Sequence, residues 1–218
     1  MYIYCNNYQT GYERAAMPYL VKKSNVFPPH IVDDPYWQDE WGSRYTMMLP
    51  YFDGCPIGPK FLPKGGYLEA DANSLASFVP LPTWLCTAEV KDVIESVEPD
   101  VHRFHPFAVR RNETSQEVVQ EYLTINFCNS LKVFNPNTTD PKLFKKVGNG
   151  LVFNDLQINI NRADGIPINL AIHEDVMQEH HAALDPRIGF GSLFLSDAMH
   201  DALLPYLNNG HFWVFKTV

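Results

Sequence analysis

Residues 84–99, Trp-Leu-Cys-Thr-Ala-Glu-Val-Lys-Asp-Val-Ile-Glu-Ser-Val-Glu-Pro, join a short apolar segment directly to a helical pattern. Thr87 occupies the N-cap position, and Glu89 lies in the first turn, where the helix dipole favours an acid. Pro99 predicts the end of the helix. The predicted buried face has the spacing i, i+3, i+4, i+7 and consists of Val90, Val93, Ile94 and Val97.

A similar arrangement occurs near the C-terminus, where Phe194-Leu195 lead into Ser196 as N-cap and Asp197 follows in the first turn. Pro205 predicts that this helix ends or kinks early, and Asn208-Asn209-Gly210 predicts a C-cap and turn. In both segments a strand leads into a capped helix. This shared local arrangement explains their likeness without a duplication of the sequence. The predicted buried stripe consists of Met199, Ala202, Leu203 and Tyr206.

Three other segments, residues 123–128, 156–160 and 212–217, alternate between apolar and other residues. This period of two predicts half-buried strands in an antiparallel arrangement. Residues 1–80 are rich in proline and aromatics, which predicts short strands and ordered loops, and Gly65-Gly66 predicts a turn. We therefore expect an α+β fold in one domain over residues 1–218, with a mainly antiparallel sheet and a few helices packed on one face.

The charge balance limits the class of partner. The 218 residues include 17 Lys and Arg against 25 Asp and Glu, a net charge of −8, which argues against nucleic-acid binding. The sequence lacks a signal-peptide pattern and an apolar run of the ~20 residues that cross a bilayer, so we expect a cytoplasmic protein without a membrane partner. The four cysteines are far apart and are expected to be reduced thiols, although a secreted protein with two disulfides could have the same count: Cys5, Cys55, Cys86 and Cys128.

The segment His173–His181 concentrates histidines and acids, which makes it a candidate metal site. His173 and His180 are seven positions apart, about 10.5 Å along a helix, which is too far to share one ion unaided. We therefore favour a solvated amphipathic helix with Met177 and Leu184 facing inward. A metal-assisted hydrolase that uses the His173–His181 cluster is kept as an alternative function.

The sequence His102-Arg-Phe-His105 places His102 and Phe104 on one face of an extended strand and His105 on the other. The expected role of each histidine is structural, buried and donating to a backbone carbonyl. The nucleophile-elbow, phosphate-loop and dinucleotide-binding patterns are absent from the sequence. We therefore expect a protein that is not an enzyme and uses no cofactor or metal.

Residues 33–41, Asp-Asp-Pro-Tyr-Trp-Gln-Asp-Glu-Trp, interleave four acids with three large aromatics, and residues 171–205 carry six acids and one arginine. Acids mixed with aromatics are typical of protein interfaces, where aromatics anchor and charge steers. Alternatively, Trp37 and Trp41 lie in the core. The candidate partner-binding residues are Asp33, Asp34, Tyr36, Trp37, Asp39, Glu40, Trp41, Glu174, Asp175 and Glu179.

Three motifs then follow one another: Glu98-Pro-Asp-Val-His-Arg-Phe-His-Pro-Phe107, Tyr122-Leu-Thr-Ile-Asn-Phe-Cys-Asn-Ser-Leu131 and Leu193-Phe-Leu-Ser-Asp-Ala-Met-His-Asp-Ala-Leu203. Together they resemble the immunity proteins of bacterial polymorphic-toxin systems, specifically immunity protein family eleven, formerly a domain of unknown function. The likeness covers about residues 80–218. The preceding part of the chain is similar only in its aromatic, proline-rich character.

The resemblance implies a non-enzymatic antidote that binds a cognate bacterial toxin and blocks its active site or substrate access. The acidic balance of the chain favours a basic toxin domain. Two features depart from the family pattern: His105 replaces a second aromatic, and residues 173–188 look like extra material suited to partner contacts. A scaffold protein with another partner is a further alternative. The motif residues expected to be structural are His102, Phe104, Pro106, Ser196 and Asp197.

Overall fold

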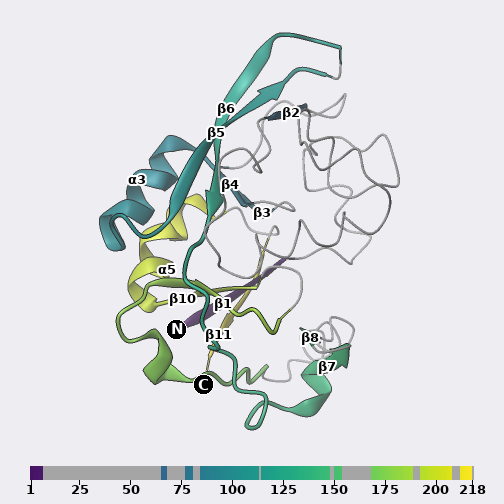
Figure 1. The fold of residues 1–218 in the computed structure, drawn as a ribbon, viewed down its shortest axis with the longest axis vertical. Helices are drawn as coiled ribbons and strands as arrows, with labels where there is room; N and C mark the ends of the chain where they lie inside the picture. The colour runs from purple at the N-terminus through teal and green to yellow at the C-terminus, as the bar shows by residue number, and fades with distance from the viewer. Residues whose placement is uncertain are drawn as a thin grey trace.

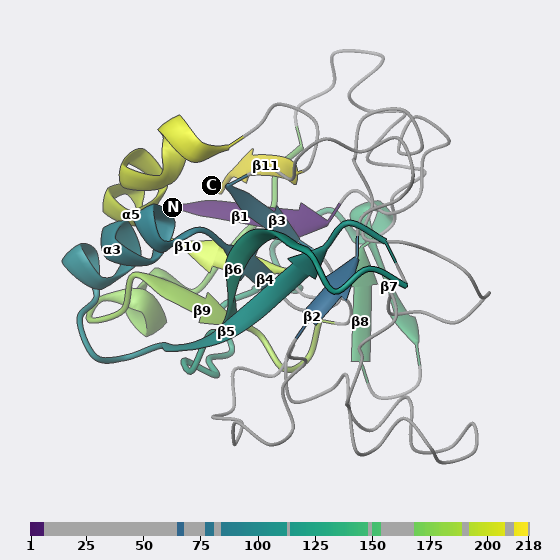
Figure 2. The ribbon, with the colours of Figure 1, turned by 90° about the horizontal axis from the view of Figure 1, so that it is seen from above.

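The computed structural model describes residues 1–6, 65–67, 77–80, 84–112, 114–147, 150–153, 168–188, 192–207 and 212–217. These residues form an α+β fold in which the sheets are mostly antiparallel and the two α-helices lie together on one side (Figures 1 and 2). The predicted fold class is therefore confirmed.

The larger sheet has the strand order β2-β5-β6-β4-β3. Its longest pair is β5 and β6, which run antiparallel from Arg103 opposite Asn126 to Arg110 opposite Val118. β2 is parallel to β5, whereas the other pairs of this sheet are antiparallel. The strands are β2 (Gly65–Tyr67), β3 (Phe78–Pro80), β4 (Trp84–Cys86), β5 (Arg103–Arg110) and β6 (Val118–Asn126).

The turn predicted at Gly65-Gly66 is wrong, because both residues lie in β2. Gly65 is opposite Ala108 in β5, and a Cβ atom on Gly65 would lie 2.7 Å from the Ala108 carbonyl oxygen. The pair of glycines therefore reflects a close approach of two backbones rather than a change of chain direction.

A second sheet has the order β11-β1-β10-β9, with every neighbouring pair antiparallel. β11 confirms the strand expected at residues 212–217, whereas the strand expected at 156–160 lies outside the described residues. A separate hairpin is formed by β7 and β8. The strands are β1 (Tyr2–Asn6), β7 (Phe144–Val147), β8 (Gly150–Phe153), β9 (Ala182–Leu184), β10 (Leu193–Leu195) and β11 (Phe212–Lys216).

Both predicted helices are present and lie side by side (Figures 1 and 2). α3 (Ala88–Val97) buries Val90 and Ile94. α5 (Asp197–Leu203) passes into a 3₁₀ turn, η4 (Leu204–Tyr206), which contains Pro205, as expected from the proline. The turn expected at residues 208–210 lies outside the described residues.

The two N-caps differ. The Ser196 Oγ atom accepts a hydrogen bond from the Met199 backbone N–H at 3.1 Å, as its position predicts. Thr87 occupies the N-cap of α3 but its side chain makes no capping hydrogen bond. The Oγ1 atom of Thr87 is buried and has no hydrogen-bond partner among the described residues.

The expectation that β6 is half-buried is wrong at its C-terminal end. Thr124 and Asn126 are both fully buried, although their neighbour Ile125 on the opposite face is also buried. Both faces of this end of the strand are therefore covered, whereas its N-terminal half is more exposed.

Two hydrophobic cores meet at β9 and β10. Leu184 and Leu193 face α3 and α5 in one core, whereas Ala183 and Phe194 belong to the other. Because successive side chains of a strand alternate between faces, this strand pair forms a wall between the two cores.

Residues 173–184 do not form the continuous amphipathic helix expected from the sequence. A short 3₁₀ helix, η3 (Glu174–Met177), is followed by a turn and then by β9, because residues 182–184 pair with β10. Met177 and Leu184 are nevertheless buried, as predicted.

Cys86 and Cys128 are thiols, and burial raises the pKa of the Cys86 thiol far above its ordinary value, which keeps it protonated. The side chains of Cys5 and Cys55 lie outside the described residues. Among the helices that the structure describes, none combines the length and apolar character needed to cross a membrane.

Candidate functional site

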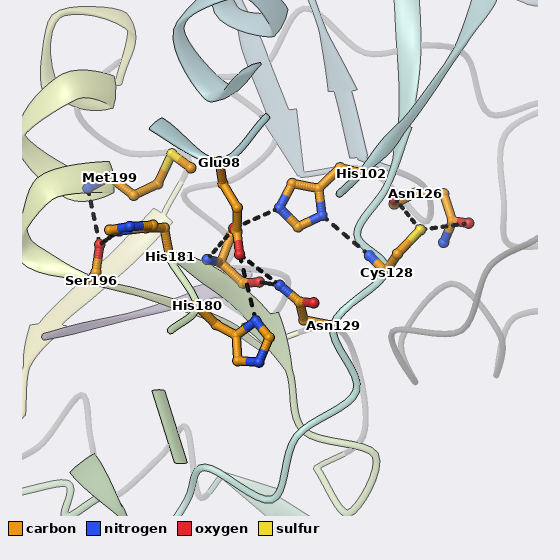
Figure 3. Close-up of polar contacts among 10 residues, drawn as sticks. Glu98, His102, Asn126, Cys128, Asn129, His180, His181, Ser196 and Met199 are labelled. Carbon is orange, nitrogen blue, oxygen red and sulfur yellow. Dashed lines mark hydrogen bonds and ion pairs between the residues drawn. The ribbon is translucent and has the colours of Figure 1, made fainter. Parts of the chain in front are cut away.

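A buried carboxylate, Glu98, lies at the C-cap of α3 and collects hydrogen bonds from three separate segments (Figure 3). Its Oε2 atom lies 3.0 Å from His102 Nε2 and accepts the Ala182 backbone N–H at 2.9 Å. Its Oε1 atom accepts from Asn129 Nδ2 at 2.9 Å and lies 3.7 Å from His180 Nδ1. We call Glu98, His102, Asn129, His180 and Ala182 the Glu98 cluster.

The hydrogen bonds of His102 define its tautomer. Its Nδ1 atom accepts the backbone N–H of Cys128 at 3.2 Å, so the proton of the neutral ring lies on Nε2 and is donated to Glu98. The expectation that His102 donates to a backbone carbonyl is therefore wrong. His102 also lies just before β5 rather than within it, and its ring meets Phe127 edge-on at 5.0 Å between centroids.

The environment of Glu98 favours its ionised form. Burial alone would raise the pKa of this carboxyl. The hydrogen bonds from the His102 side chain and from the backbone at residues 181 and 182 outweigh burial, and the pKa lies below its usual value. A charged, fully hydrogen-bonded carboxylate therefore lies beneath the surface at the junction of α3, β6 and β9.

The backbone next to Glu98 is held by further hydrogen bonds. Asn129 Nδ2 also donates to the Ala182 carbonyl oxygen at 2.9 Å, and the Ser196 N–H donates to the His181 carbonyl oxygen at 2.9 Å. His181 Nδ1 lies 2.8 Å from Ser196 Oγ. Since that oxygen accepts the Met199 N–H, its own proton is available for His181, and the turn before β9 is linked to the start of α5 (Figure 3).

The predicted partner-binding residues fall into two groups. Glu174, Asp175 and Glu179 are exposed on residues 173–181, which we call the acidic segment. The other group, residues 33–41, lies outside the described residues. The acidic segment leads directly into the turn that Glu98 and Ser196 hold.

The geometry does not assemble the alternative metal site. His180 lies beside Glu98, and His181 lies beside Ser196, so the two rings serve different partners (Figure 3). His173 is at the N-cap of η3. Within the part of the chain that the structure describes, no three His, Cys, Asp or Glu side chains are grouped to hold a metal ion.

The other motif residues lie outside the Glu98 cluster: Phe104 and Pro106 are in β5, and Asp197 begins α5. Phe104 is partly buried against α3, with Lys91 Nζ 5.9 Å from its ring centroid, while Pro106 and Asp197 are exposed. Among the described residues, the buried Nε2 atom of His105 has no hydrogen-bond partner. Burial, and then the nearby Arg103 charge, lower the pKa of the His105 ring.

Sequence reasoning missed the central residue. In the sequence, Glu98 stands out only as the first residue of a family motif, and no local pattern marks Asn129. A signal was present, because an acid at a helix C-terminus opposes the helix dipole and needs a compensating partner. His102, four residues later, is that partner.

A family model described as Immunity protein family (Imm11) matches residues 49–217. The match covers well over half of the chain and begins before residue 80, where the motif resemblance was expected to begin. The matched family is a class of immunity proteins. The chain belongs to the Imm11 family. No curated protein matches the chain.

Proposed function

We propose that this protein is an antidote that binds a cognate bacterial toxin and neutralises it by occupying its surface. Membership of an immunity protein family supports a protein-binding role. The observation that carries the finer proposal is the distribution of exposed charge over the described residues. It favours a toxin domain with a basic surface.

Exposed acids are concentrated on α3 and the turn that follows it, on α5 and on the acidic segment. Residues 88–100, 173–181 and 196–206 contain one lysine or arginine, Lys91, and it is partly buried over Phe104. We call this surface the acidic flank. Its exposed acids are Glu89, Asp92, Asp100, Glu174, Asp175, Glu179, Asp197 and Asp201.

Exposed lysines gather elsewhere. Lys145 and Lys146 lie on β7, and Lys142 lies in the preceding 3₁₀ turn, η2 (Pro141–Leu143). Both ribbon views place β7 on the opposite side of the molecule from α3 and α5 (Figures 1 and 2). A basic partner is therefore attracted to one side and repelled by the other, which favours one orientation of encounter.

Association kinetics with the purified cognate toxin domain test the proposal. Neutralising the acidic segment by the triple change Glu174→Gln, Asp175→Asn and Glu179→Gln should lower the association rate constant about threefold or more at low salt. The matched control is Lys142→Gln, Lys145→Gln and Lys146→Gln, which should leave the rate constant unchanged or raise it. A wild-type protein that forms no complex at micromolar concentration would overturn the proposal. Equal rates for all three proteins would remove the acidic segment from the interface.

Residues 33–41 are proposed as a second contact region on their sequence alone. If Trp37 anchors the toxin, Trp37→Ala should raise the dissociation rate constant while thermal unfolding is unchanged. If the variant instead unfolds at a clearly lower temperature, the ring belongs to the core and this contact region is wrong.

A further inference from the structure

We propose that Glu98 is the positioning residue of the toxin-binding surface: its buried carboxylate fixes the acidic segment in the conformation that the toxin meets. The inference rests on the proposed function, and it assigns a role to a residue that is itself almost entirely buried. Glu98 acts through the backbone it holds and makes no toxin contact.

The acidic segment is anchored at its start and in its middle by ordinary packing. The His173 N–H donates to the Val133 carbonyl oxygen at 2.7 Å, and Ile172 forms an isolated bridge with Phe134. Met177 is 3% exposed and lies in the core shared with these residues. These contacts position Glu174 and Asp175, and the His180 N–H, which donates to the Met177 carbonyl oxygen at 3.0 Å, continues the turn toward the end of the segment.

The end of the segment is held by Ser196, whose N–H donates to the His181 carbonyl oxygen, and by Glu98. The Glu98 Oε2 atom accepts the Ala182 N–H, and the Asn129 amide that donates to Glu98 Oε1 also donates to the Ala182 carbonyl oxygen. One carboxylate therefore orders both polar groups of the residue that follows the segment. His180 Nδ1, 3.7 Å from the same carboxylate, is held beside it, next to the exposed Glu179.

A carboxylate is required because every neighbour within hydrogen-bond distance is a donor. His102 Nε2–H, Asn129 Nδ2 and the Ala182 N–H all point to acceptor oxygens. A glutamine at this position has the same shape but brings an NH₂ group that must face at least one of these donors. The substitution therefore removes charge and an acceptor without leaving a cavity.

Fixing the segment matters for affinity. Ordering a loop during association costs free energy that is subtracted from the interaction, so a surface that is already ordered binds more tightly. The acids of the segment then reach the toxin together, as a set with fixed spacing. Loss of this order should mainly shorten the lifetime of the complex.

The test compares Glu98→Gln with Asp185→Asn. Asp185 is an equally buried carboxylate, but it accepts from the backbone N–H groups of Phe134 and Arg187 and from the Arg187 side chain, and within the described residues it makes no hydrogen bond to residues 180–182. In the free protein, Glu98→Gln should accelerate amide hydrogen exchange at residues 180–182 on the order of tenfold or more. Asp185→Asn should leave exchange at these amides unchanged. Equal exchange at 180–182 in the two variants would overturn the proposal.

Binding supplies a readout that a purely structural role would not move. Glu98→Gln should raise the toxin dissociation rate constant, and the triple neutralisation of the acidic segment should then have a smaller effect than in the wild-type background. Full additivity in this cycle would overturn the proposal, because residues that act through one another do not add. If wild type binds no toxin, the proposed function fails, while hydrogen exchange still reports the positioning. If Glu98→Gln does not fold, Asn129→Ala, which keeps the carboxylate but removes the amide that donates to both Glu98 Oε1 and the Ala182 carbonyl oxygen, is the second variant and has the same expected outcomes.

Discussion

At the scale of the residue, buried polar groups in this protein fall into satisfied and unsatisfied sets. Glu98 and Asp185 each gather several donors, so their burial is compensated by hydrogen bonds. Within the part of the chain that the structure describes, the Oγ1 atoms of Thr87 and Thr124 and the Nε2 atom of His105 are buried without partners. The satisfied groups join segments far apart in the chain. We therefore expect their replacement to lower the free energy of unfolding more than replacement of the unsatisfied groups.

The first prediction concerns pH. The pKa of Glu98 is lower in the folded protein than in the unfolded chain, where it is about 4.3. Its contribution to the free energy of unfolding is therefore fully present above that value and is lost as the pH falls through the lower folded pKa. Denaturant unfolding of wild type and Glu98→Gln between pH 7 and pH 3 should show a difference that is constant at high pH and shrinks below about pH 4.3. A difference that stays constant to pH 3 would contradict the prediction.

The second prediction compares the two N-caps. Ser196→Ala removes the acceptor of the Met199 N–H and the partner of His181, and should lower the free energy of unfolding by about 1–2 kcal/mol. Thr87→Ala is the matched control, because the Thr87 hydroxyl makes no capping bond and is buried unsatisfied. It should cost less than about 0.5 kcal/mol or be stabilising. If urea denaturation shows the same loss of unfolding free energy in both variants, the capping hydrogen bond does not determine that loss.

At the scale of the element, helices were predicted well because caps, proline and a 3.6-residue period act locally. α3 and α5 follow the predicted N-caps and end close to the predicted prolines. Strand β9 could not be predicted, since its three residues gain their conformation from pairing with β10 and not from their own pattern. The Glu98 cluster was missed for the same reason: its members come from positions 98 to 182 and meet only in the fold.

The third prediction concerns strand β2. Gly65→Ala should lower the free energy of unfolding by about 1–3 kcal/mol, because the new Cβ would lie 2.7 Å from the Ala108 carbonyl oxygen, a backbone atom that cannot rotate away. Thermal or urea unfolding measures the loss. A variant as stable as wild type would mean that β2 and β5 separate at little cost, and that the close approach of these strands is not required.

At the scale of the whole molecule, the separation of the acidic flank from the exposed lysines is the feature with the widest consequence. Lys142, Lys145 and Lys146 contribute positive charge far from α3 and α5, so the overall charge of −8 understates the local field of the flank. The sequence predicted the acidic balance and the exposure of Glu174 and Asp175. It could not predict that the acids of two helices would join them on one side.

The fourth prediction is a salt dependence. The association rate constant with the toxin should fall steeply between about 20 mM and 300 mM salt, because the Debye length shrinks below the distance over which the flank acts. The dissociation rate constant should change much less. The variant with Glu174, Asp175 and Glu179 neutralised should show a shallower dependence of association on salt. Salt-independent association of wild type would exclude electrostatic steering by this surface.

The position of β1 also constrains how the chain acquires its structure on the ribosome. β1 (Tyr2–Asn6) pairs on one side with β10 and on the other with β11, so its two neighbours are residues 193–195 and 212–216. During synthesis β1 must wait, without either neighbour, until residues 193–216 have emerged. Closing so long a loop is slow. We therefore expect nascent chains that lack residues 193–217 to expose β1 and to depend on chaperones for solubility.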